Sequence, residues 1–298
     1  MLQRDQNLIK PQHFSVVVCC RNAQETITKC LQSIVKAGAL NIIIVDGNSE
    51  DKTRELITRE GLKINLGKGQ GLPIDRQYGV DLSNTPYTFF VDADHVVEPN
   101  FFNEMLFHFK EKEVDVMQSK LRLLDPKGVL NKGEDDYYQV IHNVHTDKRM
   151  LGLAPIIFKT ENLKTGEKWE IVSPSSKSID DTSWAKRASD RGAVFAVDGP
   201  EVFQIHSSGF KSYLNKFRWY GKGDAEFILE FPSRTAQMLF HLSIRYPFVY
   251  GIKMLRSGKS FGVLYVFLQG VIRLVSCLTA LSKSILLNKI HESLFNRS

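Results

Sequence analysis

Apolar runs alternate with amphipathic segments along the first half of the chain, and the spacing within each predicts an element. The runs Phe14–Cys20 and Ile42–Val45 are short and rich in β-branched residues, which predicts two buried strands. The segment between them predicts a helix ending at Gly38, because its apolar residues recur at helical spacing: Ile27, Leu31, Ile34 and Val35.

The same alternation continues toward the middle of the chain. Residues 50–61 predict a second helix, residues 87–94 a strand and residues 99–112 another helix. Short strands that alternate with helices predict the α/β class, here a doubly wound, mostly parallel sheet with helices on both faces. Residues 114–125 predict one more strand, and the chain after Phe210 predicts apolar, basic helices.

Length and charge divide the chain into two parts. Its 298 residues suffice for one large α/β domain and an appendage. We expect a catalytic domain over residues 1–222, with a donor half at about 14–115 and an acceptor half at about 116–222. We expect a basic helical extension over 223–298, because residues 210–298 hold 13 Lys and Arg against 4 Asp and Glu. Such a segment suits an anionic membrane or a phosphorylated substrate; we expect no nucleic-acid partner.

Cysteine usage and the N-terminus bear on the compartment. Cys19, Cys20, Cys30 and Cys277 show no metal-ligand spacing, which predicts free thiols in a reducing cytoplasm. The first residues lack the apolar core of a secretory signal peptide. We therefore expect a cytoplasmic protein.

The apolar C-terminal segment predicts contact with a membrane surface. Its longest charge-free run, residues 260–272, is too short to span a bilayer. A polar stripe recurs along it at spacings of three and four: Gln269, Arg273, Ser276, Thr279 and Lys283. This pattern favours a helix lying in the membrane interface, with Lys253, Arg256 and Lys259 near lipid headgroups on the inner face of the cytoplasmic membrane. Packing on its own domain or on a partner remains an alternative.

Carboxylates follow two of the predicted strands. In an open α/β sheet the ligand crevice lies beyond the carboxyl ends of the strands. Asp92 and Asp94 are one residue apart there, and two carboxylates on one face favour a bound Mg²⁺ or Mn²⁺. Asp46 ends another strand, where it can accept a hydrogen bond from a ribose or a base, while Asp51 or Ser49 caps the next helix. The alternatives are a turn that uses one Asp as an acceptor and a capping role for Asp46.

Six further positions carry candidate chemistry. Arg76 lies in the glycine-containing segment 67–79, which predicts a flexible loop near a diphosphate. Asp180 and Asp181 precede a predicted helix, where they serve either the helix dipole or general-base catalysis. His206 follows a strand-like run and suits either a structural or a metal-binding role. The remaining two are a cation for a diphosphate and an aromatic ring for a sugar or the core: Arg218 and Trp219.

Taken together, the motifs resemble family 2 glycosyltransferases, which have the GT-A nucleotide-sugar-binding fold. The resemblance runs from Phe14 to Lys222 and rests on the order and spacing of "FSVVVCCRNAQETITKCLQSI", "IIIVDGNSEDKT", "GKGQGLPIDRQYG", "FFVDADHVVEPNFF", "DDTSWAKR" and "HSSGFKSYLNKFRWYGKG". Two departures are Asp180, where the family usually has Glu, and Cys19-Cys20, where Pro-Thr is usual.

The resemblance implies a role for each matching position. Asp181, with Asp180 beside it, is implied as the catalytic base. Asp92 and Asp94 are implied as the pair that holds Mn²⁺ or Mg²⁺ on the donor diphosphate. The other implied positions are the nucleoside contact, the donor-site arginines, a later metal- or donor-site histidine and an acceptor-site tryptophan: Asp46, Arg76, Arg218, His206 and Trp219.

The implied reaction is an inverting transfer of a sugar, of the hexosyltransferase type, from a nucleotide sugar to an acceptor hydroxyl. UDP is the default nucleotide, and the implied acceptor is a glycan or lipid-linked glycan of surface polysaccharide or cell-envelope synthesis. One alternative is a sugar-phosphate nucleotidyltransferase, which would want a glycine-rich signature with Arg and Lys where residues 19–26 stand. A non-catalytic module that binds a nucleotide sugar is the other. The sequence leaves the oligomeric state open.

Overall fold

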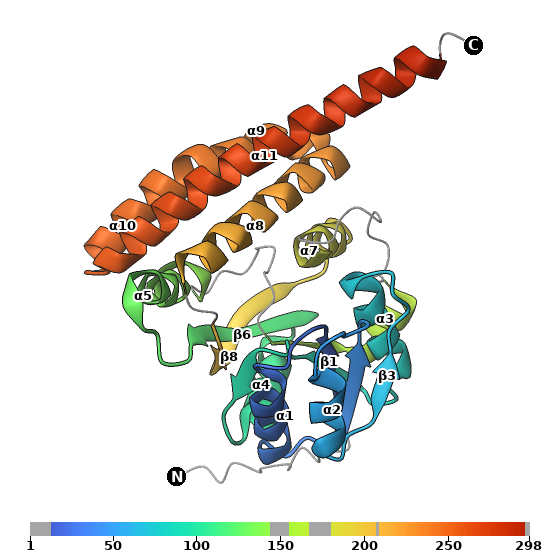
Figure 1. Ribbon diagram of the computed structural model, residues 1–298. Helices are drawn as coiled ribbons and strands as arrows, with labels where there is room; N and C mark the ends of the chain where they lie inside the picture. Colours follow the sequence, from blue (N-terminus) through green and yellow to red (C-terminus); the bar gives the residue numbers. More distant parts are fainter. Residues whose placement is uncertain (1–12, 144–154, 167–179, 207–208, 296–298) are drawn as a thin grey trace. The chain divides into compact units, whose positions relative to one another are not determined.

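The chain forms two compact units. The computed structural model describes residues 13–143, 155–166, 180–206 and 209–295 (Figure 1). The sheet unit comprises Met1–Asp125, His142–Val172 and Asp180–His206, and the helical unit comprises Pro126–Ile141, Ser173–Ile179 and Ser207–Ser298. Helix α8 (Phe210–Glu230) runs through residue 222 without interruption. The units thus have other bounds than the two domains expected from the sequence, whose division remains a prediction.

The sheet unit is built on one mixed sheet of eight strands in the order β3-β2-β1-β4-β7-β6-β8-β5. The strands are β1 (Phe14–Cys20), β2 (Asn41–Asp46), β3 (Ile64–Leu66), β4 (Tyr87–Phe90), β5 (His95–Val97), β6 (Val116–Leu123), β7 (Ile156–Lys159) and β8 (Phe195–Gln204). The neighbours β3-β2-β1-β4 and β6-β8 pair in parallel, whereas β7 and β5 pair antiparallel with their neighbours. The predicted α/β class is confirmed, with its parallel part at the N-terminal strands.

Six helices of the described chain belong to the sheet unit: α1 (Ile27–Lys36), α2 (Thr53–Arg59), α3 (Leu72–Leu82), α4 (Phe101–Lys112), α6 (Thr160–Thr165) and α7 (Asp180–Asp190). The flexible loop predicted over residues 67–79 is wrong for most of its length, because α3 begins at Leu72. Pro73 lies in the first turn of α3, where its missing N–H costs nothing, and the glycines are confined to the preceding residues. Val35, predicted on the apolar face of α1, is 51% exposed.

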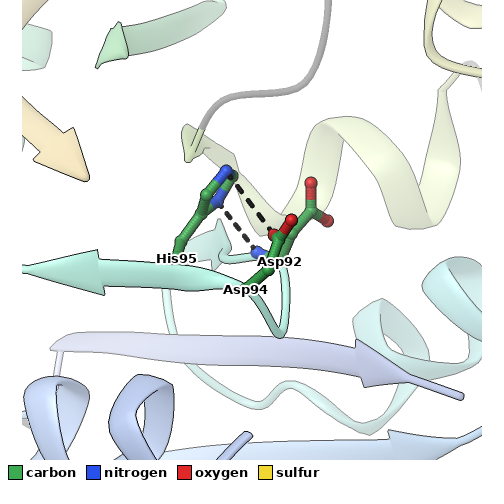
Figure 2. Close-up of side chains that lie close together, drawn as sticks. All are labelled: Asp92, Asp94 and His95. Carbon is green, nitrogen blue, oxygen red and sulfur yellow. Dashed lines mark hydrogen bonds and ion pairs between the residues drawn. The ribbon is translucent and has the colours of Figure 1, made fainter. Parts of the chain in front are cut away.

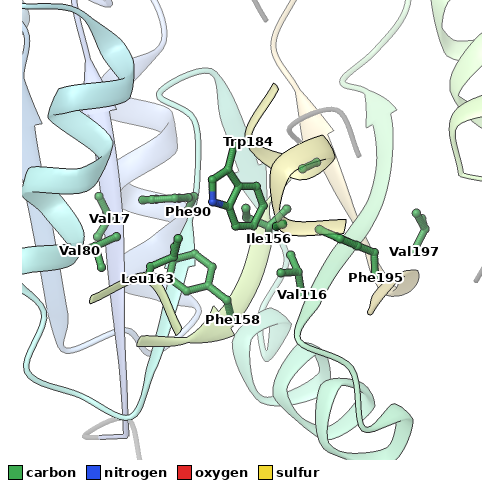
Figure 3. Close-up of a cluster of buried hydrophobic side chains, with 12 residues drawn as sticks. Val17, Val80, Phe90, Val116, Ile156, Phe158, Leu163, Trp184, Phe195 and Val197 are labelled. Carbon is green, nitrogen blue, oxygen red and sulfur yellow. The ribbon is translucent and has the colours of Figure 1, made fainter. Parts of the chain in front are cut away.

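A hydrophobic cluster fixes α3, α6 and α7 on the sheet. Figure 3 shows Trp184 of α7 beside Phe90 of β4, with Phe158 and Phe195 in the same cluster. The rings of Trp184 and Phe195 meet edge to face at a centroid distance of 6.0 Å. Burial of a large aromatic side chain contributes on the order of 3 kcal/mol. Helix α7 is therefore held against β4. This packing positions the Asp181 carboxylate, which lies at the start of α7.

The helical unit consists of helical segments packed side by side: α5 (Gly128–Tyr137), the π-helical η2 (Tyr138–His142), α8, the 3-10 turn η3 (Pro232–Arg234), α9 (Thr235–Phe240), the π-helical η4 (His241–Tyr250), α10 (Gly251–Arg256) and α11 (Ser260–Phe295). Helix α11 packs along α8, α5 and η4 (Figure 1). Within the described residues, the segment Ser260–Ser284 of α11 has the length and apolar composition that a membrane-crossing helix requires.

The polar stripe of α11 faces inward along its first half. Arg273 donates two hydrogen bonds to the Asp224 carboxylate, of 2.9 Å from Nε and 2.6 Å from Nη2, and a third to the Tyr246 hydroxyl. Gln269 is also buried. These two members of the stripe face the helical unit, because Asp224 on α8 offers Arg273 a buried partner. The predicted contact of this segment with a membrane stays a prediction.

Candidate functional site

The Asp92–Asp94 pair lies on a tight turn between β4 and β5. The backbone N–H of His95 donates to the Asp92 carbonyl at 2.9 Å, which closes the turn. The expected strand alternation therefore does not bring the two carboxylates together; the turn does. Oxygen atoms of Asp92 and Asp94 and a ring nitrogen of His95 all lie within 4.8 Å of one another (Figure 2). Both carboxylates remain partly exposed.

Strand β8 fixes Asp94 from the other side. The Gln204 amide donates to the Asp94 carboxylate at 2.8 Å, and the Ile205 N–H donates to the Asp94 carbonyl at 2.7 Å. His206 follows directly, with Nε2 at 3.5 Å from the Asp125 carbonyl oxygen. The end of β8 therefore brings His206 to the neighbourhood of the Asp92–Asp94 turn, although its role as a metal ligand stays a prediction.

Arg76 approaches the same turn from α3. Its Nη2 donates to Asp92 Oδ1 at 3.2 Å, and its side chain is almost fully buried. A buried guanidinium needs such a partner, because an uncompensated charge in the interior is costly. The sequence placed Arg76 near the donor; the structure places it against one of the two acidic residues. The Cys30 thiol of α1 also donates to the Asp92 carbonyl, at 3.4 Å.

His95 supports the turn from the interior. The backbone N–H of Asp92 donates to His95 Nδ1 at 3.3 Å, so the neutral ring carries its proton on Nε2. That Nε2 lies 3.8 Å from Asp94 Oδ1, and it is buried without a hydrogen-bond partner among the described residues (Figure 2). With Nδ1 engaged by the turn, only Nε2 faces Asp94, at a distance too long for a hydrogen bond.

The donor set fits a hard divalent cation. Two carboxylates one residue apart, both reachable from solvent, offer the oxygen ligands that Mg²⁺ and Mn²⁺ prefer. Without a cation their charges are offset only in part by Arg76 on Asp92. The turn can therefore hold a cation that still has open positions for a phosphate group.

Asp46, at the end of β2, is fully buried, and its carboxylate is already in use. Ser49 donates to it through both its N–H and its hydroxyl, and Arg54 Nε donates at 2.6 Å. Burial alone would raise the pKa of Asp46, but these hydrogen bonds and the Arg54 charge outweigh it, so the pKa is lowered. Asp46 is thus ionised and closed off by Arg54, which is itself partly exposed and able to move.

The N-cap of α2 is Lys52, which makes no side-chain capping hydrogen bond, so the cap expected at Asp51 or Ser49 is wrong; Asp51 lies one residue earlier. Its carboxylate accepts the N–H and the hydroxyl of Thr53 and the N–H of Gln24. This arrangement leaves the strand-end position to Asp46.

The four cysteines are free thiols, as predicted.

Asp181 lies at the start of α7, one turn before Trp184. Its Oδ1 accepts the N–H of Thr182 at 2.7 Å. Trp184 shares a cluster with Phe90, which ends β4 two residues before Asp92, so α7 packs on the sheet beside β4. The side chain of Asp180 lies outside what the structure describes.

Arg218 and Trp219 belong to α8 in the helical unit, where both are exposed. Their predicted contacts with the diphosphate and the acceptor stay predictions.

Sequence reasoning missed three side chains that shape the site: Arg54, His95 and Gln204. Of the three, His95 had a signal in the sequence: it directly follows Asp94, and a histidine next to paired carboxylates is typical of a metal site. Gln204 is 110 residues from Asp94, and Arg54 is one of many exposed helix arginines, so neither left a local signal.

Similarity to known proteins bears on the family to which this chain belongs. The profile of the family described as Glycosyl transferase family 2 matches residues 15–182, more than half of the chain. Teichoic acid poly(glycerol phosphate) polymerase of Staphylococcus epidermidis is 26% identical over 182 residues, which cover 53% of this chain and 25% of the polymerase. The uncharacterized glycosyltransferase YibD of Escherichia coli is 26% identical over 112 residues, 35% of this chain and 33% of YibD. The chain spans a third or less of these relatives' lengths.

Solved structures share the fold. Residues 1–349 of Staphylococcus aureus TarS superpose with a TM-score of 0.52 at 16% identity, covering 91% of this chain and 90% of TarS 1–349, which has also been solved with UDP-GlcNAc. Glucosyl-3-phosphoglycerate synthase from Mycobacterium tuberculosis, solved with Mg²⁺ and UDP, gives 0.51 at 14% identity and covers 73% of this chain and 79% of the synthase. At such identities the likeness shows the fold alone. With the profile match, it establishes that this chain belongs to glycosyl transferase family 2 and has a GT-A-type fold.

Proposed function

We propose that the chain is an inverting, metal-dependent glycosyltransferase that moves a sugar from a nucleotide sugar to an acceptor hydroxyl. UDP is the proposed nucleotide; the TarS and synthase structures were solved with UDP-GlcNAc or UDP. The proposed acceptor is a glycan or lipid-linked glycan of the cell envelope, in keeping with the teichoic acid polymerase among the relatives. The observation that carries the proposal is the convergence of Asp92, Asp94 and Arg76, the first two on the turn after β4 and the third reaching it from α3.

The Asp92–Asp94 turn is the proposed cation site. Asp92 and Asp94 would hold Mn²⁺ or Mg²⁺, with His206 as a further ligand from the end of β8. A cation bound there supplies positive charge to the diphosphate that leaves the sugar. Arg76 holds Asp92 in place, because a buried guanidinium and a carboxylate at 3.2 Å restrain each other.

Asp46 and Arg54 are proposed to meet the nucleoside. Asp46 is ionised and offers acceptor oxygens to a ribose hydroxyl or a base N–H, once Arg54 turns away from it. Arg218 is proposed to contact the diphosphate and Trp219 the acceptor.

Asp181 is the proposed catalytic base, with Asp180 as its neighbour. Its carboxylate takes the proton of the acceptor hydroxyl as that oxygen attacks the anomeric carbon and the bond to the nucleoside diphosphate breaks. The Thr182 N–H donates to one oxygen of this carboxylate and so helps to orient it. Family membership supports transfer of a sugar over the nucleotidyltransferase alternative.

The proposal includes peripheral attachment to the inner face of the cytoplasmic membrane through the C-terminal helices. The apolar, basic composition of that region supports it.

Two measurements test the proposed activity. A thermal-shift screen of nucleotide sugars with Mn²⁺ should find a stabilising donor, because a ligand that binds only the folded state raises the Tm. Asp181→Asn should bind that donor with normal affinity and lose transfer by about 10³-fold or more, since the amide cannot accept the proton. Transfer at wild-type rate would move the base to Asp180 or elsewhere, and failure of every donor to bind or to be hydrolysed would refute the enzyme.

A further inference from the structure

The helical unit has an apolar core, yet many further apolar side chains lie exposed on its surface. Arg273, Asp224 and Gln269 point into the unit. The exposed apolar residues of α11 follow one another at spacings of three and four, so they form a continuous stripe: Phe261, Leu264, Phe267, Val271, Val275 and Leu278.

A second exposed stripe runs along η4 and α10, which pack against α11. It consists of Ile244, Phe248, Val249, Ile252 and Leu255, the last of them 63% exposed. We call the two stripes together the outer apolar face. Scattered apolar residues are normal on a protein surface, but exposed apolar side chains that recur along two neighbouring helical segments mark an interaction surface.

The charges around the outer apolar face have one sign. Residues 231–284 contain seven Lys and Arg and no Asp or Glu. Arg273 is paired with Asp224, and Lys259 lies 3.2 Å from Asp136 on α5. Lys253 and Arg256 are exposed on α10, beside Ile252 and Leu255. An apolar strip bordered by exposed cations is complementary to a surface that is apolar inside and anionic at its rim.

We propose that the outer apolar face docks on an anionic lipid bilayer, with the stripes in the acyl boundary and Lys253 and Arg256 among the headgroup phosphates. This extends the membrane attachment included in the proposed function to a defined face and lipid charge. A second copy of the chain is the less favourable occupant. A two-fold interface sets the same patch against itself and would bring like charges together.

The helical unit lies flat on the bilayer rather than crossing it. The bidentate Arg273–Asp224 pair holds α11 along α8. Helix α8 exposes Lys211, Arg218 and Lys222, and a spanning α11 would carry these charges into the hydrocarbon with it. Lying flat, α11 keeps its inner polar groups on α8 and gives only its outer stripe to lipid.

The test is co-sedimentation of the full chain with vesicles at low salt. Vesicles containing about a third phosphatidylglycerol should bind the chain, and pure phosphatidylcholine vesicles should bind it far less. Lys253→Gln with Arg256→Gln should weaken binding about 25-fold, because each basic residue near an anionic surface contributes about fivefold. Phe248→Ser with Leu255→Ser should weaken it by at least about tenfold.

Matched controls lie on α1 of the sheet unit. Lys29 and Lys36 are exposed lysines, and Leu40 beyond them is an exposed leucine. Lys29→Gln with Lys36→Gln, and separately Leu40→Ser, should bind anionic vesicles like the wild type. Because all the substituted side chains are exposed, every variant should unfold at the same temperature as the wild type.

Three results would overturn the inference. The first is that the chain does not bind anionic vesicles. The second is that variants of the outer apolar face and the control variants bind equally. The third is that the chain forms a dimer without vesicles and that the Phe248 and Leu255 substitutions dissociate it. Donor hydrolysis with Mn²⁺ in vesicle-free buffer should be the same in every variant. Failure of the lipid inference is therefore distinguishable from failure of the proposed enzyme, which would abolish hydrolysis and leave vesicle binding intact.

Discussion

Asp198→Asn offers the most quantitative test of the sheet unit. Asp198 lies on β8, the strand that carries Gln204 to Asp94. Lys112 Nζ of α4 lies 3.1 Å from one carboxylate oxygen, and Lys120 Nζ of β6 lies 3.4 Å from the other. The substitution keeps the shape of the side chain and removes its charge.

The magnitude follows from the pKa of Asp198. Burial alone would raise it, but the Gly199 N–H and the two lysines lower it from 3.8 to about 2. One pKa unit corresponds to about 1.4 kcal/mol, so the carboxylate contributes at most about 2.4 kcal/mol to the free energy of unfolding. Because the side chain keeps 24% of its exposure, we expect about 2 kcal/mol at pH 7.

The pH dependence has a definite sign. A carboxylate with a lowered folded-state pKa stabilises fully above its unfolded pKa, and the contribution fades as the pH falls through the folded value. The stability difference between wild type and Asp198→Asn should therefore be constant from pH 5 to 8. About half of it should remain at pH 3, and about a fifth at pH 2.

Urea unfolding followed by circular dichroism at several pH values measures this difference. Glu55→Gln is the matched control, because Glu55 pairs with Arg59 on an exposed helix face and should contribute less than about 0.5 kcal/mol. A difference for Asp198→Asn below 0.5 kcal/mol at pH 7, or one that does not shrink between pH 5 and 2, would refute the reasoning.

Two further predictions concern the buried Arg273–Asp224 pair and the ligands of the cation. Arg273→Met should lower the free energy of unfolding by about 3 to 5 kcal/mol, because it leaves the buried Asp224 unpaired, whereas Arg273→Met with Asp224→Leu should recover most of that loss in the same urea assay; a single variant as stable as the wild type would contradict the pair's burial. In pulsed EPR of bound Mn²⁺, the signal of a directly coordinated nitrogen should persist in His95→Asn and vanish in His206→Gln. The reverse pattern would make His95 the ligand.

Strand-end topology allowed the positions of the acidic residues to be predicted from sequence. Asp46 and Asp92 each follow an apolar run, and parallel strands bring such residues to one edge of a sheet. The turn that brings Asp92 and Asp94 together was not predictable. Residues two apart lie on one face in a strand but not in a turn, and the sequence pattern favoured a strand. The helix at residues 72–82 was not predicted, because the glycines that precede it are typical of a loop.

Side-chain partners far apart in sequence account for the remaining misses. A polar stripe on α11 indicates that its members share a face, but not whether water, lipid or another helix lies opposite. Asp224, 49 residues from Arg273, decides that question. In the same way Arg54 occupies Asp46, a contact that depends on how α2 packs beside β2.

Isothermal titration of UDP into the protein with Mn²⁺, and again with a chelator, tests the central claim most directly. If the Asp92–Asp94 turn holds the cation that carries the diphosphate, removal of the metal should weaken UDP binding by more than about tenfold. Asp94→Asn, which keeps an acceptor oxygen for Gln204, should do the same in the presence of Mn²⁺. Equal affinity for UDP with Mn²⁺, with chelator and in Asp94→Asn would contradict the assignment of this turn as the metal and donor site.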